Sequence, residues 1–156
     1  MELLYRQLWV VFILVTYVNA RMWRSRVQRR IEAKPELEPG YRRLYRGYLV
    51  WMNVPWLLMG VGIFAGQVTS TFDYFELNGE NTFVVFWWVL QVALVVLGTW
   101  WVFVGGGAEM LERHPGVDMV PEWPASRLRL YWVGMIVLNV AIGAHFYFLF
   151  PGQPRP

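Results

Sequence analysis

The sequence predicts an all-α integral membrane protein with four transmembrane helices and both chain ends outside, and three observations lead to this prediction. The chain of 156 residues is 56% hydrophobic and only 16% charged, which is too apolar for an ordinary soluble domain. Its apolar residues fall into four blocks, each close to the roughly 20 residues that cross a bilayer as a helix. Most of the cations lie in one connection between two of these blocks.

The cation-rich connection sets the expected orientation. Nine of the 14 lysines and arginines lie between residues 21 and 46. Because cationic connections are retained on the cytoplasmic side, we expect this segment inside and a multi-pass protein of the bacterial inner membrane. The expected partners are the bilayer and its anionic headgroups, with no nucleic acid. The arginines expected to contact anionic lipid or a partner protein are Arg24, Arg26, Arg29, Arg30, Arg42, Arg43 and Arg46.

The first expected span covers about residues 3–20. A signal peptide carries its cations before the apolar run, whereas here they follow it, so we expect a retained helix. The segment 21–47 is predicted to be a helical hairpin that projects beyond the membrane. An apolar stripe continues through the arginines to Ile31, and the Pro- and Gly-containing segment 35–40 is typical of a turn.

The second expected span covers about residues 48–66. Its candidates for helix packing or for lining a pore are Asn53, Pro55, Gly62 and Gly66. Pro55 has no amide hydrogen to donate, so the helix is expected to bend there. Gly62 and Gly66 form a small-xxx-small pair, which is typical of membrane helices that approach closely.

The connection 67–82 is predicted to lie outside. It contains Asp73, Glu76 and Glu80 without any Lys or Arg. Aromatic residues alternate with these acids, which favours a short segment resting on the outer interface. A cation-attracting vestibule is the alternative.

The third expected span covers about residues 83–104 and the fourth about residues 130–150. Pairs of tryptophans near both ends of the third span are typical of aromatic belts. Gln91 and Gly98 of the third span and Asn139 and His145 of the fourth join the candidates for packing or a pore. Gln91 and Asn139 are both expected near the midplane, where an unpaired amide is costly, so we predict a hydrogen bond between them. Thr16, Asn19 and Asn53 are expected to join the first two spans similarly.

The cytoplasmic loop 105–129 holds the weak metal-site candidates Glu109, Glu112 and His114. A di-iron bundle requires a Glu-x-x-His motif on each of two helices, and this loop does not contain that pattern. A short interfacial helix that ends at Pro115 is therefore expected. The Gly-Gly-Gly run and the His-Pro-Gly triplet in this loop stand out, but neither predicts a function.

No cofactor is expected. The chain has no cysteine, which excludes disulfides and thiolate metal sites. His145 is an ionisable group within a span and so a functional candidate, although a neutral imidazole that donates to a neighbouring carbonyl is the favoured explanation. His114 and His145 are expected on opposite sides of the membrane, so one protomer cannot ligate a haem with both.

Three functional hypotheses remain. The first is a non-enzymatic accessory or self-associating component of a membrane complex, because the polar side chains in the spans are few and neutral. The second is a homo-oligomeric channel or carrier for an ion or small solute. The third is a membrane enzyme whose cytoplasmic site would combine Glu109, Glu112, His114 and Asp118.

Overall fold

The computed structural model describes residues 2–75, 80–117 and 122–149, with side chains for 5–75, 80–117 and 122–142. The predicted all-α class is confirmed, because every regular element in these ranges is helical. The α-helices are α1 (Glu2–Ala33), α2 (Glu38–Trp51), α3 (Val54–Phe64), α4 (Thr82–Phe103), α5 (Gly107–Arg113) and α6 (Ala125–Leu149), and the 3-10 helices are η1 (Pro35–Leu37) and η2 (Thr71–Phe75).

Three helical segments are long and apolar enough to cross a membrane. They are Pro35–Phe64, Thr82–Phe103 and Ala125–Ile142, which contain most of the second, third and fourth expected spans. Such helices are those of a membrane protein. The described part of α1 is not among these segments. The first expected span, 3–20, includes two residues whose side chains lie outside the described part of the chain.

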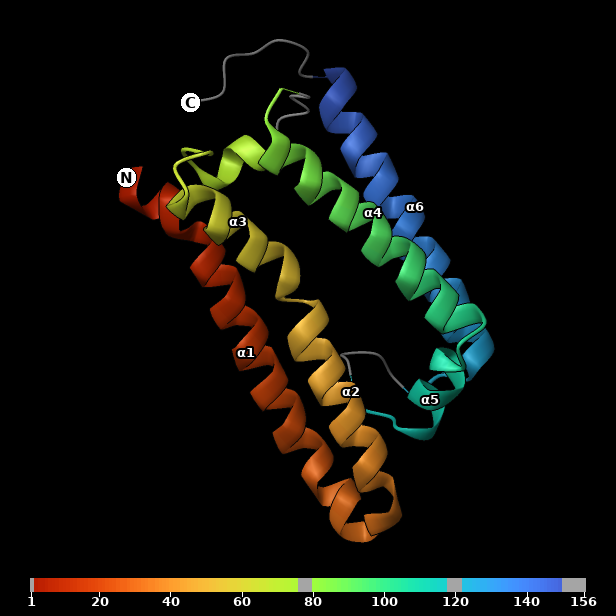
Figure 1. The fold of residues 1–156 in the computed structure, drawn as a ribbon. Coiled ribbons are helices and arrows are strands. Elements are labelled where there is room, and N and C mark those ends of the chain that lie inside the picture. Colours follow the sequence, from red (N-terminus) through yellow and green to blue (C-terminus); the bar gives the residue numbers. More distant parts are fainter. Residues whose placement is uncertain (1, 76–79, 118–121, 150–156) are drawn as a thin grey trace.

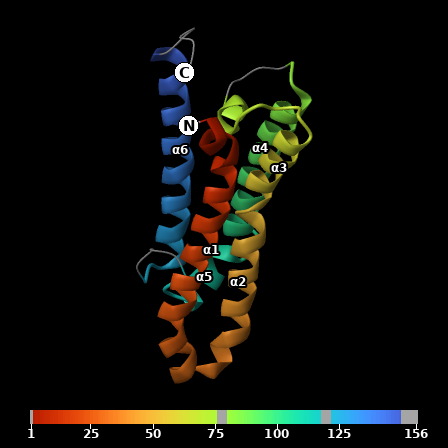
Figure 2. The same cartoon turned by 90° about the vertical axis from the view of Figure 1, so that its left-hand side faces the viewer.

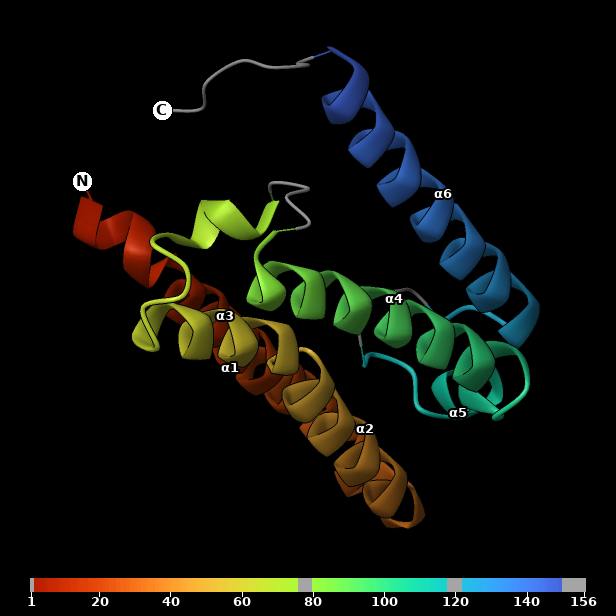
Figure 3. The same cartoon turned by 45° about the horizontal axis from the view of Figure 1, so that its top comes forward.

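The helices form two groups that share one end of the molecule. α1 runs antiparallel to α2 and α3, and η1 closes this pair at the lower end of Figure 1. α4 and α6 meet at α5 and diverge from there, as Figures 1 and 3 show. The start of α1 and the far end of α6 lie at the end of the molecule opposite η1 (Figure 1).

Aromatic rings hold α1 against α3. Phe12 stacks on Trp56 with ring centroids 4.2 Å apart, and Trp9 meets Phe64 edge-on at 5.8 Å. Trp9 also covers Gly60, where an added Cβ would lie 3.0 Å from the indole. Aromatic pairs of this kind contribute about 0.5–1.5 kcal/mol beyond the area that they bury. The two helices therefore lie in direct contact along this stretch.

The bend expected at Pro55 is present as an interruption between α2 and α3. At Asn53 the backbone amide bonds to Val50 O at 3.2 Å, in the i−3 pattern, instead of to the carbonyl of Leu49. The Asn53 side chain supplies the missing donor, because its Nδ2 bonds to Leu49 O at 2.7 Å. The proline thus breaks the helix, and the neighbouring amide restores the lost hydrogen bond.

Gly66 does not pair with Gly62 on one helix, so the prediction of a small-xxx-small motif is wrong. α3 ends at Phe64, and Gly66 lies beyond it with a φ of +67°. That left-handed conformation turns the chain so that the amide of Gln67 bonds to Gly62 O at 3.0 Å. Glycine adopts this conformation without a steric penalty, which is why it commonly follows a helix.

The connection after α3 folds back onto the helices. Thr71 and Tyr74 of η2 are fully buried, and Tyr74 Oη donates to Met59 O at 3.3 Å. Tyr74 also fills the space beside Gly62, where an added Cβ would lie 1.9 Å from the phenol oxygen. Burial raises the pKa of Tyr74 to about 12, and the charge of Asp73 adds to this effect. A segment expected to rest on the interface is thus anchored against α3.

The carboxylate of Asp73 accepts hydrogen bonds within its own loop. Its Oδ2 accepts hydrogen bonds from Thr69 N at 2.9 Å and from Ser70 N at 3.0 Å, and both of these residues also donate through their hydroxyls. Burial by itself would raise the pKa of Asp73, but these hydrogen bonds outweigh it and the pKa is lowered. The carboxylate is therefore used to hold the turn, which does not favour the alternative of a cation-attracting vestibule.

We predict that Gly62→Ala destabilises the protein because the new methyl group collides with Tyr74 Oη. Overpacking of this kind costs about 1–3 kcal/mol. Tyr74→Phe removes the colliding atom and one hydrogen bond, at a cost of about 1 kcal/mol. The double variant should therefore lose less than the sum of the two single losses, as measured by thermal unfolding in detergent. Strictly additive losses would contradict this packing.

Candidate functional site

The predicted hydrogen bond between Gln91 and Asn139 is absent. Asn139 Nδ2 donates to Met135 O at 2.7 Å, one turn back in its own helix, and the residue is exposed. Gln91 is half-buried on α4 and makes no hydrogen bond to the described part of the chain. An amide in an apolar helix can be satisfied by the carbonyl at i−4, so midplane depth alone does not require a partner helix.

The second predicted polar layer is also not formed. Thr16 Oγ1 donates to Phe12 O at 2.9 Å within α1, and Asn53 Nδ2 is used at the break before α3. Asn19 is exposed. None of the described hydrogen bonds therefore joins these three side chains across the first two helices.

A different polar contact joins α4 and α6. Trp132 Nε1 donates to Thr99 Oγ1 at 3.0 Å, and Thr99 in turn donates to Val95 O at 2.7 Å. The same indole covers Gly98, where an added Cβ would lie 2.8 Å from the ring. Gly98 thus makes room for an aromatic ring of the same chain. The sequence could not identify Thr99 as the partner of Trp132, because a tryptophan near the end of a membrane helix is also typical of an aromatic belt.

The three weak metal-site candidates lie in different environments. Glu109 forms a short ion pair with Arg129 at the start of α6, Glu112 is exposed, and His114 is buried against α2. Among the described residues no group of three His, Asp or Glu side chains is placed to hold a metal ion. Asp118 and the side chain of His145 lie outside the described residues.

Glu109 forms a structural contact between two helices. The pKa of its carboxyl is lowered by a hydrogen bond from its own backbone amide, opposed by burial, and lowered further by the adjacent Arg129 charge. The ion pair links α5 to the base of α6, which are otherwise held together by apolar contacts of Ala108 with Leu128. Sequence reasoning did not single out Arg129, because spacing along the chain carries no signal for this pairing.

The Gly-Gly-Gly run shapes the turn between α4 and α5. Gly106 has a φ of +75°, which other residues rarely adopt. Gly107 is buried beneath the indole of Trp101, and an added Cβ would lie 2.4 Å from that ring. Two of the three glycines are therefore required for different reasons, one for backbone conformation and one for close approach.

The His-Pro-Gly triplet docks against α2. The His114 ring lies against the backbone of Gly40, where an added Cβ would come within 1.9 Å of Nε2. His114 Nδ1 lies 2.7 Å from Met110 O, and since a carbonyl can only accept, Nδ1 carries the proton. Tyr41 meets the His114 ring edge-on at 5.0 Å and donates from its hydroxyl to Pro115 O at 2.8 Å. We call these contacts the tip clasp.

One ion pair lies beside the tip clasp. Arg30 of α1 and Glu122 are 2.7 Å apart, with about half of each side chain exposed or more. Exposed pairs of this kind contribute about 1 kcal/mol or less. The buried contacts of Tyr41 and His114 therefore hold the α1–α2 pair to the loop, and the ion pair adds little.

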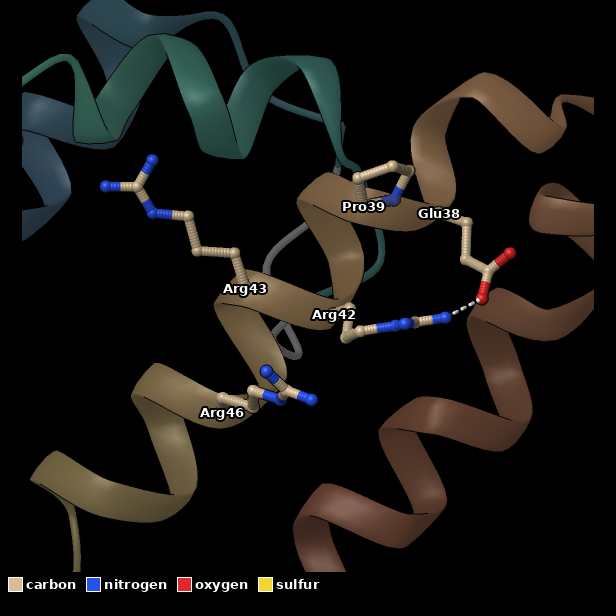
Figure 4. Close-up of a pocket in the computed structure, with 5 residues that line it drawn as sticks. All are labelled: Glu38, Pro39, Arg42, Arg43 and Arg46. Atoms are coloured by element: carbon tan, nitrogen blue, oxygen red, sulfur yellow. Dashed lines mark hydrogen bonds and ion pairs between the residues drawn. The ribbon is translucent and has the colours of Figure 1, made fainter.

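Three arginines of this region line a groove. Arg24 of α1 and Arg42 and Arg46 of α2 lie along a concavity of about 490 Å³ between the two helices. A second hollow of about 360 Å³ adjoins it on α2 and is shown in Figure 4. In that view Arg42 and Arg46 extend toward the same side of α2, whereas Arg43 extends away from them. We call the first concavity the arginine groove; it is the strongest candidate site in the described structure.

We predict that Gly40→Ala opens the tip clasp, because the methyl group and the His114 ring cannot occupy the same space. Stability should fall by about 1–3 kcal/mol, and limited proteolysis should cut the loop after α5 faster. Gly47→Ala is the matched control on α2, since nothing lies within 4 Å of an added Cβ there. It should be neutral or stabilising by up to about 1 kcal/mol. His114→Ala should partly rescue Gly40→Ala; equal effects of the two glycine variants would refute the contact.

No protein-family model matches the chain, and neither the curated proteins nor the solved structures contain a significant match.

Proposed function

We propose that this chain is a non-enzymatic, four-span component of the bacterial inner membrane that acts as an accessory or self-associating structural subunit of a larger membrane assembly. In this role the α1–α2 pair faces the cytoplasm and both chain ends lie outside. Its arginines contact anionic headgroups at the inner surface.

The observation that carries this role is the surface of α6. Among the side chains described for α6 (residues 125–142), those at its base pack against α4 and α5, chiefly Leu128 and Trp132. Beyond that base α6 diverges from α4 (Figure 3), and its apolar side chains are exposed on nearly all sides. The exposed ones are Val133, Met135, Val137, Leu138, Val140 and Ile142. A helix of this kind has contact surface for lipid or for another helix.

The use of the polar side chains supports the same role. Three polar side chains along the apolar segments, Asn53, Thr99 and Asn139, donate to nearby backbone carbonyls. The acid and the imidazole of the cytoplasmic loop are engaged in packing α5 against α6 and α2. These contacts provide structure, and they do not favour a polar path or a site where an acid and a base converge.

A fourth span is inferred from the neighbours of α1. α1 runs beside α3, which belongs to a candidate span, and Phe12 and Trp56 stack on each other. Because the two helices lie at the same depth, α1 enters the bilayer wherever α3 does. Its outward residues suit this environment, since Val11, Leu14 and Val15 are exposed and apolar.

The assembly is tested by native mass spectrometry of the complex extracted in mild detergent. The expected result is a defined homo-oligomer or a complex with other chains. Loss of that assembly on Val137→Lys, with retention on Arg26→Gln as a control, would assign the contact to α6. A strictly monomeric species at every protein concentration would overturn the proposed role.

The orientation in the membrane is tested with single introduced cysteines. The chain has no cysteine of its own, so only the introduced thiol can be labelled. Lys34→Cys should be shielded from a membrane-impermeant maleimide applied to intact spheroplasts and should react after lysis. Thr69→Cys should react in intact spheroplasts, because the proposed arrangement has the connection after α3 on the outer side of the membrane. Reaction of Lys34→Cys in intact spheroplasts would reverse the arrangement.

A further inference from the structure

We propose that the arginine groove between α1 and α2 is a specific binding site for the phosphate of one anionic phospholipid. The arginine-rich region would then contain a defined lipid site in addition to a general cationic surface. This inference rests on the proposed four-span arrangement and goes beyond it by naming the ligand class and the residues that bind it.

The charge balance of the groove favours an anion. Arg24, Arg42 and Arg46 line it together with a single carboxylate, Glu38. Glu38 Oε1 accepts a hydrogen bond from Arg42 at 2.6 Å, which neutralises one of the three cations. Two guanidinium groups, one from each helix, are left without an ion pair to the described residues. Guanidinium groups match phosphate oxygens through paired N–H donors.

The groove has an aromatic and apolar floor. Trp23 is 5% exposed and Val27 is 3% exposed, and both line the groove from α1. Arg24 lies over the ring of Tyr45, with 5.8 Å between its Cζ and the ring centroid, which holds its guanidinium at the groove wall. The indole Nε1 of Trp23 has no hydrogen-bond partner in the described structure. Such a floor accommodates the glycerol and first methylene groups of a lipid.

The position of the groove along the helices selects a lipid over a soluble anion or an acidic peptide. At about 1.5 Å per residue, Arg24 lies roughly 6 Å beyond residue 20, and Arg46 roughly 3 Å before residue 48. Those residues bound the first two expected spans, so the mouth of the groove lies at headgroup level. Phospholipid phosphates are concentrated at that depth, whereas a soluble partner would have to approach through the headgroups.

The site is tested by native mass spectrometry of the full chain in micelles that contain equal amounts of phosphatidylglycerol and phosphatidylcholine. The wild-type chain should retain one phosphatidylglycerol in preference to phosphatidylcholine. Arg24→Gln/Arg46→Gln should weaken that retention on the order of tenfold, since two charge-assisted hydrogen-bonding groups are lost. The matched control is Arg26→Gln/Arg29→Gln, which removes the same charge from exposed positions that do not line the groove.

A variant that binds the lipid more strongly makes the test independent of misfolding. Glu38→Gln releases Arg42 from its ion pair, so it should strengthen phosphatidylglycerol retention severalfold. Equal loss in the groove and control pairs, or no loss in either, would show a diffuse surface and overturn the site. Displacement of the lipid by millimolar glycerol phosphate or inorganic phosphate would assign the groove to free phosphate and overturn the lipid assignment.

The same spectra separate this inference from the proposed role. If the oligomer or partner complex persists while the two double variants bind lipid alike, only the lipid site is refuted. If the chain is monomeric yet the groove variant alone loses phosphatidylglycerol, the lipid site holds and the structural role is refuted.

Discussion

The fold depends on a local device, by which polar side chains on the apolar helices donate their hydrogen bonds to carbonyls of nearby backbone. Here the partner is most often the backbone one turn away, as for Thr16 and Asn139. At the break between α2 and α3 the same device repairs a carbonyl that the proline geometry has freed. Because these donors find acceptors locally, the contacts between the helices are mainly apolar.

Glycines and aromatic rings provide those contacts. Each of five glycines lies against a ring-bearing side chain elsewhere in the chain, and an added Cβ would come within 3.0 Å of that side chain; they are Gly40, Gly60, Gly62, Gly98 and Gly107. Such a ring connects segments that are distant in the sequence. The short connections are held in the same way, η2 by Tyr74 and the loop after α5 by His114.

The sequence was sufficient for the helical class and for three of the apolar segments, because both follow from the length and composition of uninterrupted runs. It also located the interruption at Pro55, since proline acts through its own backbone. It was not sufficient for the hydrogen bond of Asn139, because depth in the membrane does not distinguish an acceptor on a neighbouring helix from a carbonyl of the same helix. Nor could it pair Tyr41 with Pro115, which lie 74 positions apart without any periodic relation. The groove arginines were singled out only among a larger basic set, since the floor beneath them depends on how α1 and α2 pack.

The tip clasp has a mechanical consequence. Tyr41 and Gly40 are seated on the loop after α5, and α5 is fastened through Glu109 to Arg129 at the root of α6. The tip at η1 and the base of α6 are thus joined through α5 by one chain of direct contacts, so a displacement of one is resisted at the other.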